Sequence, residues 1–139
     1  MPEVRTFSNP IKFGATALAV SATNGIGYGT GAGGAVTQAT NRATGVTLNT
    51  ICGTITTSSA SLAAEVAASF VVTNSTVAIG DVVLAAQQSG AVGLMTVVEV
   101  IAVAAGSFTL AVMNNNAAAG IAETGAILIN FIVVKAVSA

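Results

Sequence analysis

The side chains that could carry out chemistry are few in this chain and far apart. The 139 residues include five carboxylates, four basic side chains, one cysteine and no histidine. Two of the carboxylates Glu65, Asp81, Glu99 and Glu123 could meet in space and act as general acid and base, but nothing in their spacing requires it. Without histidine, few groups can serve as a general base near neutral pH. The sequence therefore predicts a protein that is not an enzyme.

The cysteine and the glycine run carry no recognisable cofactor chemistry. Cys52 is the only cysteine, so neither an intrachain disulfide nor a cysteine-based metal cluster can form. We expect a small buried side chain there, because no histidine can activate the thiol. Residues 29–34 match G-x-G-x-x-G formally, but a Thr-rich strand follows and residues 50–58 hold no acid. We expect no cofactor and no metal.

The low charge of the chain limits its partners. Only 6% of the residues are charged and the net charge is −1, whereas soluble domains draw about a quarter of their residues from Asp, Glu, Lys and Arg. Four dispersed cations cannot form the basic patch that nucleic acid requires. Much of the surface must be uncharged, which suits contact with protein better than contact with water. We therefore expect a subunit of an assembly that binds no nucleic acid.

The most apolar stretches do not predict a membrane span. A spanning helix needs about 20 apolar residues, and residues 92–112 are interrupted by Glu99. Residues 125–137 are too few and contain Asn130 and Lys135. Both stretches are rich in Val and Ile, which favours strands. We expect no membrane partner.

Residues 1–34 are predicted to form an extended N-terminal arm. Pro2 and Pro10 disfavour helix, and residues 13–20, although they mimic the apolar part of a signal peptide, are treated as structural. Glycine at every second position from 25 to 33 has the period of a strand and leaves one face bare. Both a packed arm and a flexible linker remain open. The candidate contacts with a partner protein or a neighbouring subunit are Val4, Phe7, Ile11, Phe13 and Tyr28, and packing on their own domain is the alternative.

Residues 35–139 are predicted to form one β domain. Short apolar stretches alternate with turns rich in Gly, Asn and Ser. The expected strands are 35–40, 45–50, 53–57, 67–73, 81–88, 95–103, 107–113 and 127–137. Eight strands at this spacing predict an antiparallel β-sandwich, a jelly roll or a barrel.

Three places in the β domain allow more than one interpretation. Leu62, Val66 and Phe70 have helical spacing, so a short helix over 61–68 is possible before a strand that ends at Thr73. Residues 127–134 are apolar on nearly both faces, which fits either a central strand or a strand at a subunit interface. Glu99 lies between two valines.

Two environments are open for Glu99. If its strand is buried on both faces, the carboxylate needs a partner, for which Arg42 or Lys135 is the candidate. An outward-facing position is the interpretation we favour. Asp81 follows Gly80 and is expected to be a turn residue.

One block of the sequence resembles a known family. Residues 31–49 read Gly-Ala-Gly-Gly-Ala-Val-Thr-Gln-Ala-Thr-Asn-Arg-Ala-Thr-Gly-Val-Thr-Leu-Asn. This is similar to a block of the capsid decoration (cement) and head-fibre base proteins of tailed bacteriophages. The resemblance continues through residues 53–56, 70–75 and 130–136, and covers about 31–139.

The resemblance implies a small trimeric β domain on the capsid exterior of a virion. There it would bridge adjacent major capsid proteins, with the arm holding the capsid while the β domain forms the trimer. The alternative is the base of a head fibre or tail fibre that binds host-surface carbohydrate. That role would need exposed aromatic side chains on the β domain. Composition alone is compatible with a dimer as well as a trimer.

Overall fold

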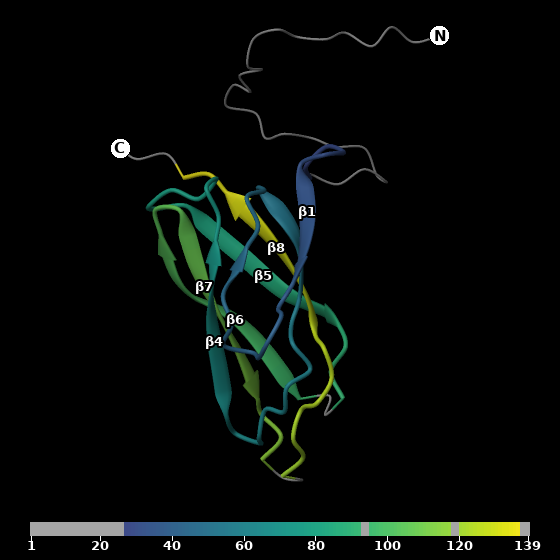
Figure 1. Cartoon of the computed structure of the whole chain (residues 1–139). Coiled ribbons are helices and arrows are strands. Elements are labelled where there is room, and N and C mark those ends of the chain that lie inside the picture. The colour runs from purple at the N-terminus through teal and green to yellow at the C-terminus, as the bar shows by residue number, and fades with distance from the viewer. Residues whose placement is uncertain (1–26, 93–94, 118–119, 137–139) are drawn as a thin grey trace, which may run out of the picture.

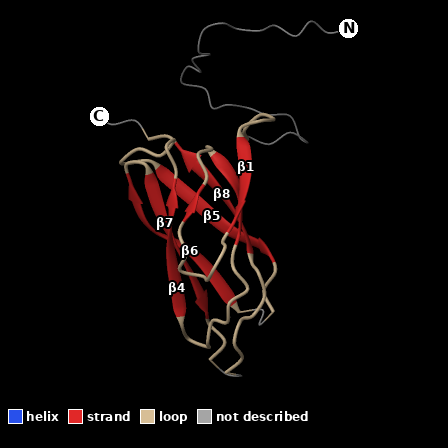
Figure 2. Ribbon diagram, in the orientation of Figure 1, coloured by secondary structure: helices blue, strands red, loops and turns tan. Residues whose placement is uncertain are grey.

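The structure, a computed structural model, describes residues 27–92, 95–117 and 120–136. Within these ranges eight strands form two four-stranded sheets, and no helix occurs (Figures 1 and 2). The all-β prediction is confirmed. The strands are β1 (Gly33–Thr37), β2 (Val46–Thr47), β3 (Cys52–Thr56), β4 (Ala67–Thr73), β5 (Val82–Ser89), β6 (Thr96–Ala104), β7 (Ser107–Asn114) and β8 (Leu128–Val134).

In each sheet, neighbouring strands do not follow one another in the order of the sequence, except for β6 and β7. Sheet A runs β1-β3-β8-β5 and sheet B runs β2-β4-β7-β6. The pairs β1–β3 and β2–β4 are parallel, while the other neighbouring pairs are antiparallel. As a result β8, the last strand in the sequence, lies in the interior of sheet A between β3 and β5.

The core lies between the sheets and follows from strict alternation along the strands. In β7 the side chains of Phe108, Leu110 and Val112 are buried, and the residues between them face outward. Phe131 of β8 meets Phe108 across the core, with ring centroids 5.1 Å apart. Full burial of each such side chain contributes about 1.5–3 kcal/mol, so this central contact between the sheets stabilises the sandwich.

Glycine allows two close backbone approaches that shape the sandwich. Gly90, which follows β5, has φ +100°, and a Cβ there would lie 2.1 Å from the carbonyl oxygen of Ala126. A Cβ at Gly53 would lie 2.7 Å from the carbonyl oxygen of Gly34, which is its partner in the β1–β3 pair. Larger residues at these positions would push apart segments that now touch.

Each of the eight predicted strand regions overlaps an observed strand, but two local predictions are wrong. The strand expected at 45–50 is only two residues long. No helix forms over 61–68: Leu62 instead exchanges two backbone hydrogen bonds of 2.9 Å with Glu123, and Glu65 has φ +61°. The tertiary bridge therefore overrides the helical spacing. The expected strand end at Thr73 is confirmed.

The first strand begins at Gly33, two residues before the predicted boundary of the β domain. Residues 27–32 precede it and are largely exposed. Four candidate contact residues lie outside the described residues: Val4, Phe7, Ile11 and Phe13.

Candidate interaction surface

Arg42 is a buried cation held by oxygen atoms. Its side chain is 3% exposed, and Nε donates to the carbonyl of Ala60 at 2.6 Å. The terminal nitrogens donate to Thr57 Oγ1 at 3.2 Å and to the carbonyls of Gly125 at 2.6 Å and Glu123 at 3.3 Å. Burial lowers the pKa of the guanidinium, and the nearby charge of Glu123 opposes that shift. The cation joins loops that are far apart in the sequence.

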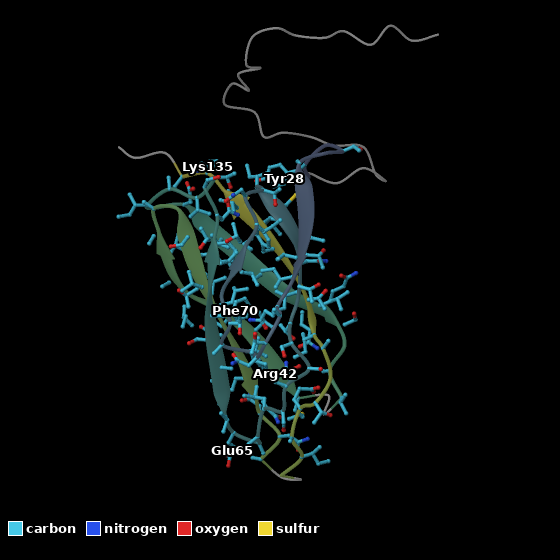
Figure 3. The ribbon with its side chains drawn as sticks, in the orientation of Figure 1. Tyr28, Arg42, Glu65, Phe70 and Lys135 are labelled. Carbon is cyan, nitrogen blue, oxygen red and sulfur yellow. The ribbon has the colours of Figure 1, made fainter. Side chains whose placement is uncertain are left out.

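The carboxylate of Glu123 is fully buried and receives backbone donors. The N–H of Val92 lies 2.8 and 3.0 Å from its two oxygens, and the N–H of Gly125 lies 2.7 Å away. Charge-assisted hydrogen bonds of this kind are stronger than neutral ones. Because both Arg42 and Glu123 are enclosed, we assign this pair a role in holding loops together. Figure 3 shows Arg42 within the body of the sandwich.

Asp81 and Lys135 form an ion pair that fastens the turn before β5 to the end of β8. Asp81 accepts hydrogen bonds from the N–H groups of Ala78 at 2.8 Å and Ala136 at 3.1 Å. Lys135 also donates to the carbonyl of Thr76 at 2.8 Å. The hydrogen bond from Lys135, followed by that from Ala78, lowers the pKa of Asp81. The turn predicted at Asp81 is confirmed.

The ionisable groups do not converge on a site in the described part of the chain. No group of three or more His, Cys, Asp or Glu residues that could hold a metal ion occurs there. Glu65 and Lys135 lie at opposite ends of the molecule (Figure 3). No helix in the described residues is long and apolar enough to cross a membrane. The outer faces of the sheets are therefore the candidate functional surfaces.

The outer face of sheet A, here called the β5/β8 face, is uncharged, and its large apolar side chains lie beside the polar side chains of Thr54, Gln88 and Asn130. Pairing in register places Cys52, Ile132 and Leu84 in one row across β3, β8 and β5, with Val134 opposite Val82 in a second row. None of the outward-pointing residues of these described strands carries a charge. Its exposed large side chains, with exposed fractions of 39–55%, are Val82, Leu84, Ile132 and Val134.

Two hollows open on the β5/β8 face, one on each side of Ile132. The larger, of about 390 Å³, is lined by Gly27, Tyr28, Cys52, Ile132 and Val134. The smaller, of about 240 Å³, is lined by Leu84, Ala85, Ala86, Asn130, Phe131 and Ile132. An apolar ridge with a hollow on each side is a shape that fits protruding apolar side chains of another protein surface.

Tyr28 is the one sequence-predicted contact residue that the structure describes. Its hydroxyl donates a hydrogen bond to the carbonyl of Val133, so the ring lies against its own sheet and forms a wall of the larger hollow. The side chain remains 43% exposed. For Tyr28 the structure thus shows packing on its own domain, and the ring also extends the β5/β8 face.

The outer face of sheet B, here called the β4/β7 face, is apolar but contains one charge. Glu99 is exposed and lies opposite Ala111 of β7. The outward position favoured for Glu99 is confirmed, so the buried alternative that required Arg42 or Lys135 as a partner does not apply. The exposed large side chains of this face are Val71, Val97, Ile101 and Met113.

Cys52 departs from the sequence prediction. It is only half-buried and points outward into the larger hollow, whereas burial was expected. The reason is the alternation of β3, in which Gly53 and Ile55 face the core and Cys52 and Thr54 face outward.

Sequence reasoning missed the apolar residues of the β5/β8 face as candidates for contact. A signal was present, because residues 127–134 are apolar on nearly both faces. The central-strand interpretation of this segment is confirmed by the position of β8. The outward side chains Ile132 and Val134 explain why the pattern also resembled that of an interface strand.

No protein-family model matches the chain, and comparisons with curated proteins and with solved structures find no similar protein.

Proposed function

We propose that this chain is a structural virion protein: a homotrimeric capsid decoration (cement) protein without enzymatic activity. It binds the capsid exterior of a phage head and stabilises contacts between major capsid proteins. The observation that carries this proposal is the pair of outer sheet faces. Both expose several large apolar side chains, and among the outward residues of the described strands only Glu99 is charged.

Outer faces with exposed apolar side chains and almost no charge are suited to contact with other proteins. Large apolar patches on a small domain mark contacts with protein, and permanent interfaces are more hydrophobic than transient ones. A sandwich with one such face on each side fits a subunit that has protein neighbours on both sides. Repeated over many copies, these contacts would stiffen a shell.

The family-like block at residues 31–49 supports the proposal at the level of the fold. Gln38, within the block, donates to the carbonyls of Arg42 at 3.2 Å and Thr44 at 2.8 Å, and it accepts from the N–H of Ser58 at 3.1 Å. The polar residues of the block are therefore occupied in fixing a loop. Binding contacts would therefore come from other residues.

Carbohydrate binding by a fibre base is less well supported. Such sites stack sugars on exposed aromatic rings, and in the described residues Phe70, Phe108 and Phe131 are at most 2% exposed. Tyr28 is the exception, and its hydroxyl is already bonded to Val133. We therefore assign the chain to the shell.

The test is cosedimentation of the purified protein with shells assembled from the major capsid protein of the same genome. We expect saturable binding and a higher melting temperature of the decorated shell. Deletion of residues 2–13 should abolish binding and leave the oligomer intact, as expected if the arm holds the capsid. Failure of the full-length protein to bind such shells would contradict the proposal.

A further inference from the structure

We infer that copies of this chain associate with one another through the β5/β8 face. This inference deepens the proposed function and rests on its claim of a homo-oligomer, since it names the surface that forms the contact. The occupant is a second copy of the chain, and three observations support that choice: the distribution of charge, the shape of the face, and its size.

Charge distinguishes the two outer faces. In a closed symmetric assembly the same residues of different copies approach one another near the axis. On the β4/β7 face this would bring copies of Glu99 together and bury like charges without partners, which is costly. The outward strand residues of the β5/β8 face carry no charge, so this face can meet its own copies without that cost.

The shape of the β5/β8 face is suited to contact with itself. Ile132 lines both hollows, and Leu84 lies on the edge strand β5 and is 55% exposed. The face thus presents both protruding apolar side chains and the hollows that could receive them. Apolar side chains that fill such hollows exclude water from both surfaces, which is the main driving force of association.

The size of the face is at the lower limit for a specific contact. Its strands β1, β3, β5 and β8 contain 5, 5, 8 and 7 residues and lie about 4.8 Å apart, so they present a surface of about 20 Å by 21 Å. Two such faces in contact bury about 800 Å² in total from the strands alone, somewhat below the size of about 1,000 Å² at which a specific interface begins. Tyr28 enlarges the contact, because its half-exposed ring borders the larger hollow.

The first experiment measures solution mass by light scattering for matched lysine variants. Leu84→Lys and Ile132→Lys place a charge on the β5/β8 face. Ile101→Lys is the control, because Ile101 is 53% exposed on β6, an edge strand of sheet B, as Leu84 is 55% exposed on β5, an edge strand of sheet A. We expect a mass of at least twice 13.5 kDa for wild type and for the control, and 13.5 kDa for the two β5/β8 variants.

A second measurement needs no substitution and covers the case in which a lysine variant fails to fold. Cys52 is the only thiol and lines the larger hollow, so the rate of maleimide labelling reports whether the face is covered. We expect labelling to be at least tenfold slower in the assembled protein than after dilution to monomer. Equal rates in the two states would overturn the inference.

The outcomes separate this inference from the proposed function. Dissociation of Ile101→Lys, with Leu84→Lys and Ile132→Lys still assembled, would overturn the choice of face and leave the decoration role standing. A monomeric wild type would overturn the self-association itself. The decoration role is decided independently by cosedimentation with shells.

Discussion

At the scale of single residues, the main feature is that three of the six charged residues in the described part of the chain are buried: Arg42, Asp81 and Glu123. Arg42 and Glu123 are both buried, and each is satisfied mainly by backbone groups. Such groups stabilise a fold only while all their partners remain, because an uncompensated buried charge is costly. These residues could not be singled out from the sequence, since Arg42 is separated by 81 positions from Glu123. Their meeting depends on the loops of the finished sandwich.

Arg42→Lys should destabilise the protein by about 2–4 kcal/mol, although it keeps the charge. An ammonium group cannot replace the fork of donors that now reaches Ala60, Thr57 and Gly125. The free energy of unfolding in urea measures the effect. Glu99→Gln is the control, because it changes an exposed side chain and should alter stability by less than about 0.5 kcal/mol. A lysine variant as stable as wild type would contradict the role assigned to the guanidinium.

The Asp81–Lys135 pair should make stability depend on pH in the acid range. The pKa of Asp81 is lowered below 3.8 in the folded protein. A carboxylate with a lowered pKa stabilises the fold above the unfolded value, and this contribution is lost as the pH falls through the folded value. Asp81→Asn should therefore lower the urea midpoint at pH 7, and the difference from wild type should shrink as the pH falls below the unfolded pKa and through the lowered folded pKa of Asp81. A difference that is constant with pH would assign the effect to the turn geometry alone.

Replacement of Glu65 by glycine should stabilise the protein. Its φ of +61° is in the left-handed region, which costs a non-glycine residue about 1–2 kcal/mol. Part of the gain is offset because glycine has more freedom in the unfolded chain, so we expect Glu65→Gly to raise the free energy of unfolding by about 0.5 kcal/mol. Thermal unfolding measures it. A loss of stability would mean that the Glu65 side chain makes a favourable contact.

At the scale of elements, the strands could be predicted but their partners could not. Alternation in residues 107–113 and turn chemistry at residues 114–116 mark where strands run and stop, because these signals are local. The parallel pairing of β1 with β3, and the insertion of β8 between β3 and β5, are non-local. The helix expected over 61–68 was wrong for the same reason, since the Leu62–Glu123 bridge lies outside any local window.

The candidate surface was only partly predictable at this scale. Tyr28 was selected from its place in the arm, whereas Leu84 was not, because nothing in its sequence neighbourhood shows which side of β5 meets the core. Once Val83 is seen to be buried, alternation places Leu84 outside. The residues of the β5/β8 face can therefore be identified only once the packing of the two sheets is known.

The segment after β5 provides a test of packing between elements. Gly90→Ala adds a Cβ 2.1 Å from the carbonyl of Ala126, in addition to the strain of a positive φ. Gly80→Ala is the matched control, with φ +89° and no atom within 4 Å of its Cβ. We expect a loss of about 1–2 kcal/mol for the control. The loss for Gly90→Ala should be larger by at least about 1–3 kcal/mol.

Equal losses in the two glycine variants would show that the segment around Ala126 can move away without cost. The free energy of unfolding in urea is again the measurement, with circular dichroism to establish that both variants keep their strands.

At the scale of the whole molecule, the low charge determines how the protein meets its surroundings. Only 6% of the residues are charged, and three of these are buried in the described part of the chain. The outer faces of the sheets therefore carry almost no charge. Association of such faces is driven by removal of apolar surface from water, with little contribution from Coulomb forces. Long-range steering by charge is also absent from a chain of net charge −1.

The assembly should therefore be insensitive to simple salt. Between about 0.05 and 0.5 M NaCl screening becomes much stronger, yet we expect the dissociation constant of the oligomer to change less than about threefold. Ammonium sulfate, which strengthens apolar burial, should tighten it. Sedimentation velocity across a dilution series measures both effects. Dissociation by NaCl would indicate that ion pairs hold the copies together.

The place of β8 in sheet A has a consequence for the order of events during synthesis. The ribosome makes β8 after the other seven strands, yet β8 supplies Ile132 and joins β3 to β5. Until it is inserted, those two strands have open edges and the β5/β8 face does not exist. A nascent chain on a crowded polysome thus cannot recruit its neighbours through this face. If copies associate through this face, the insertion of β8 into sheet A must come before their association.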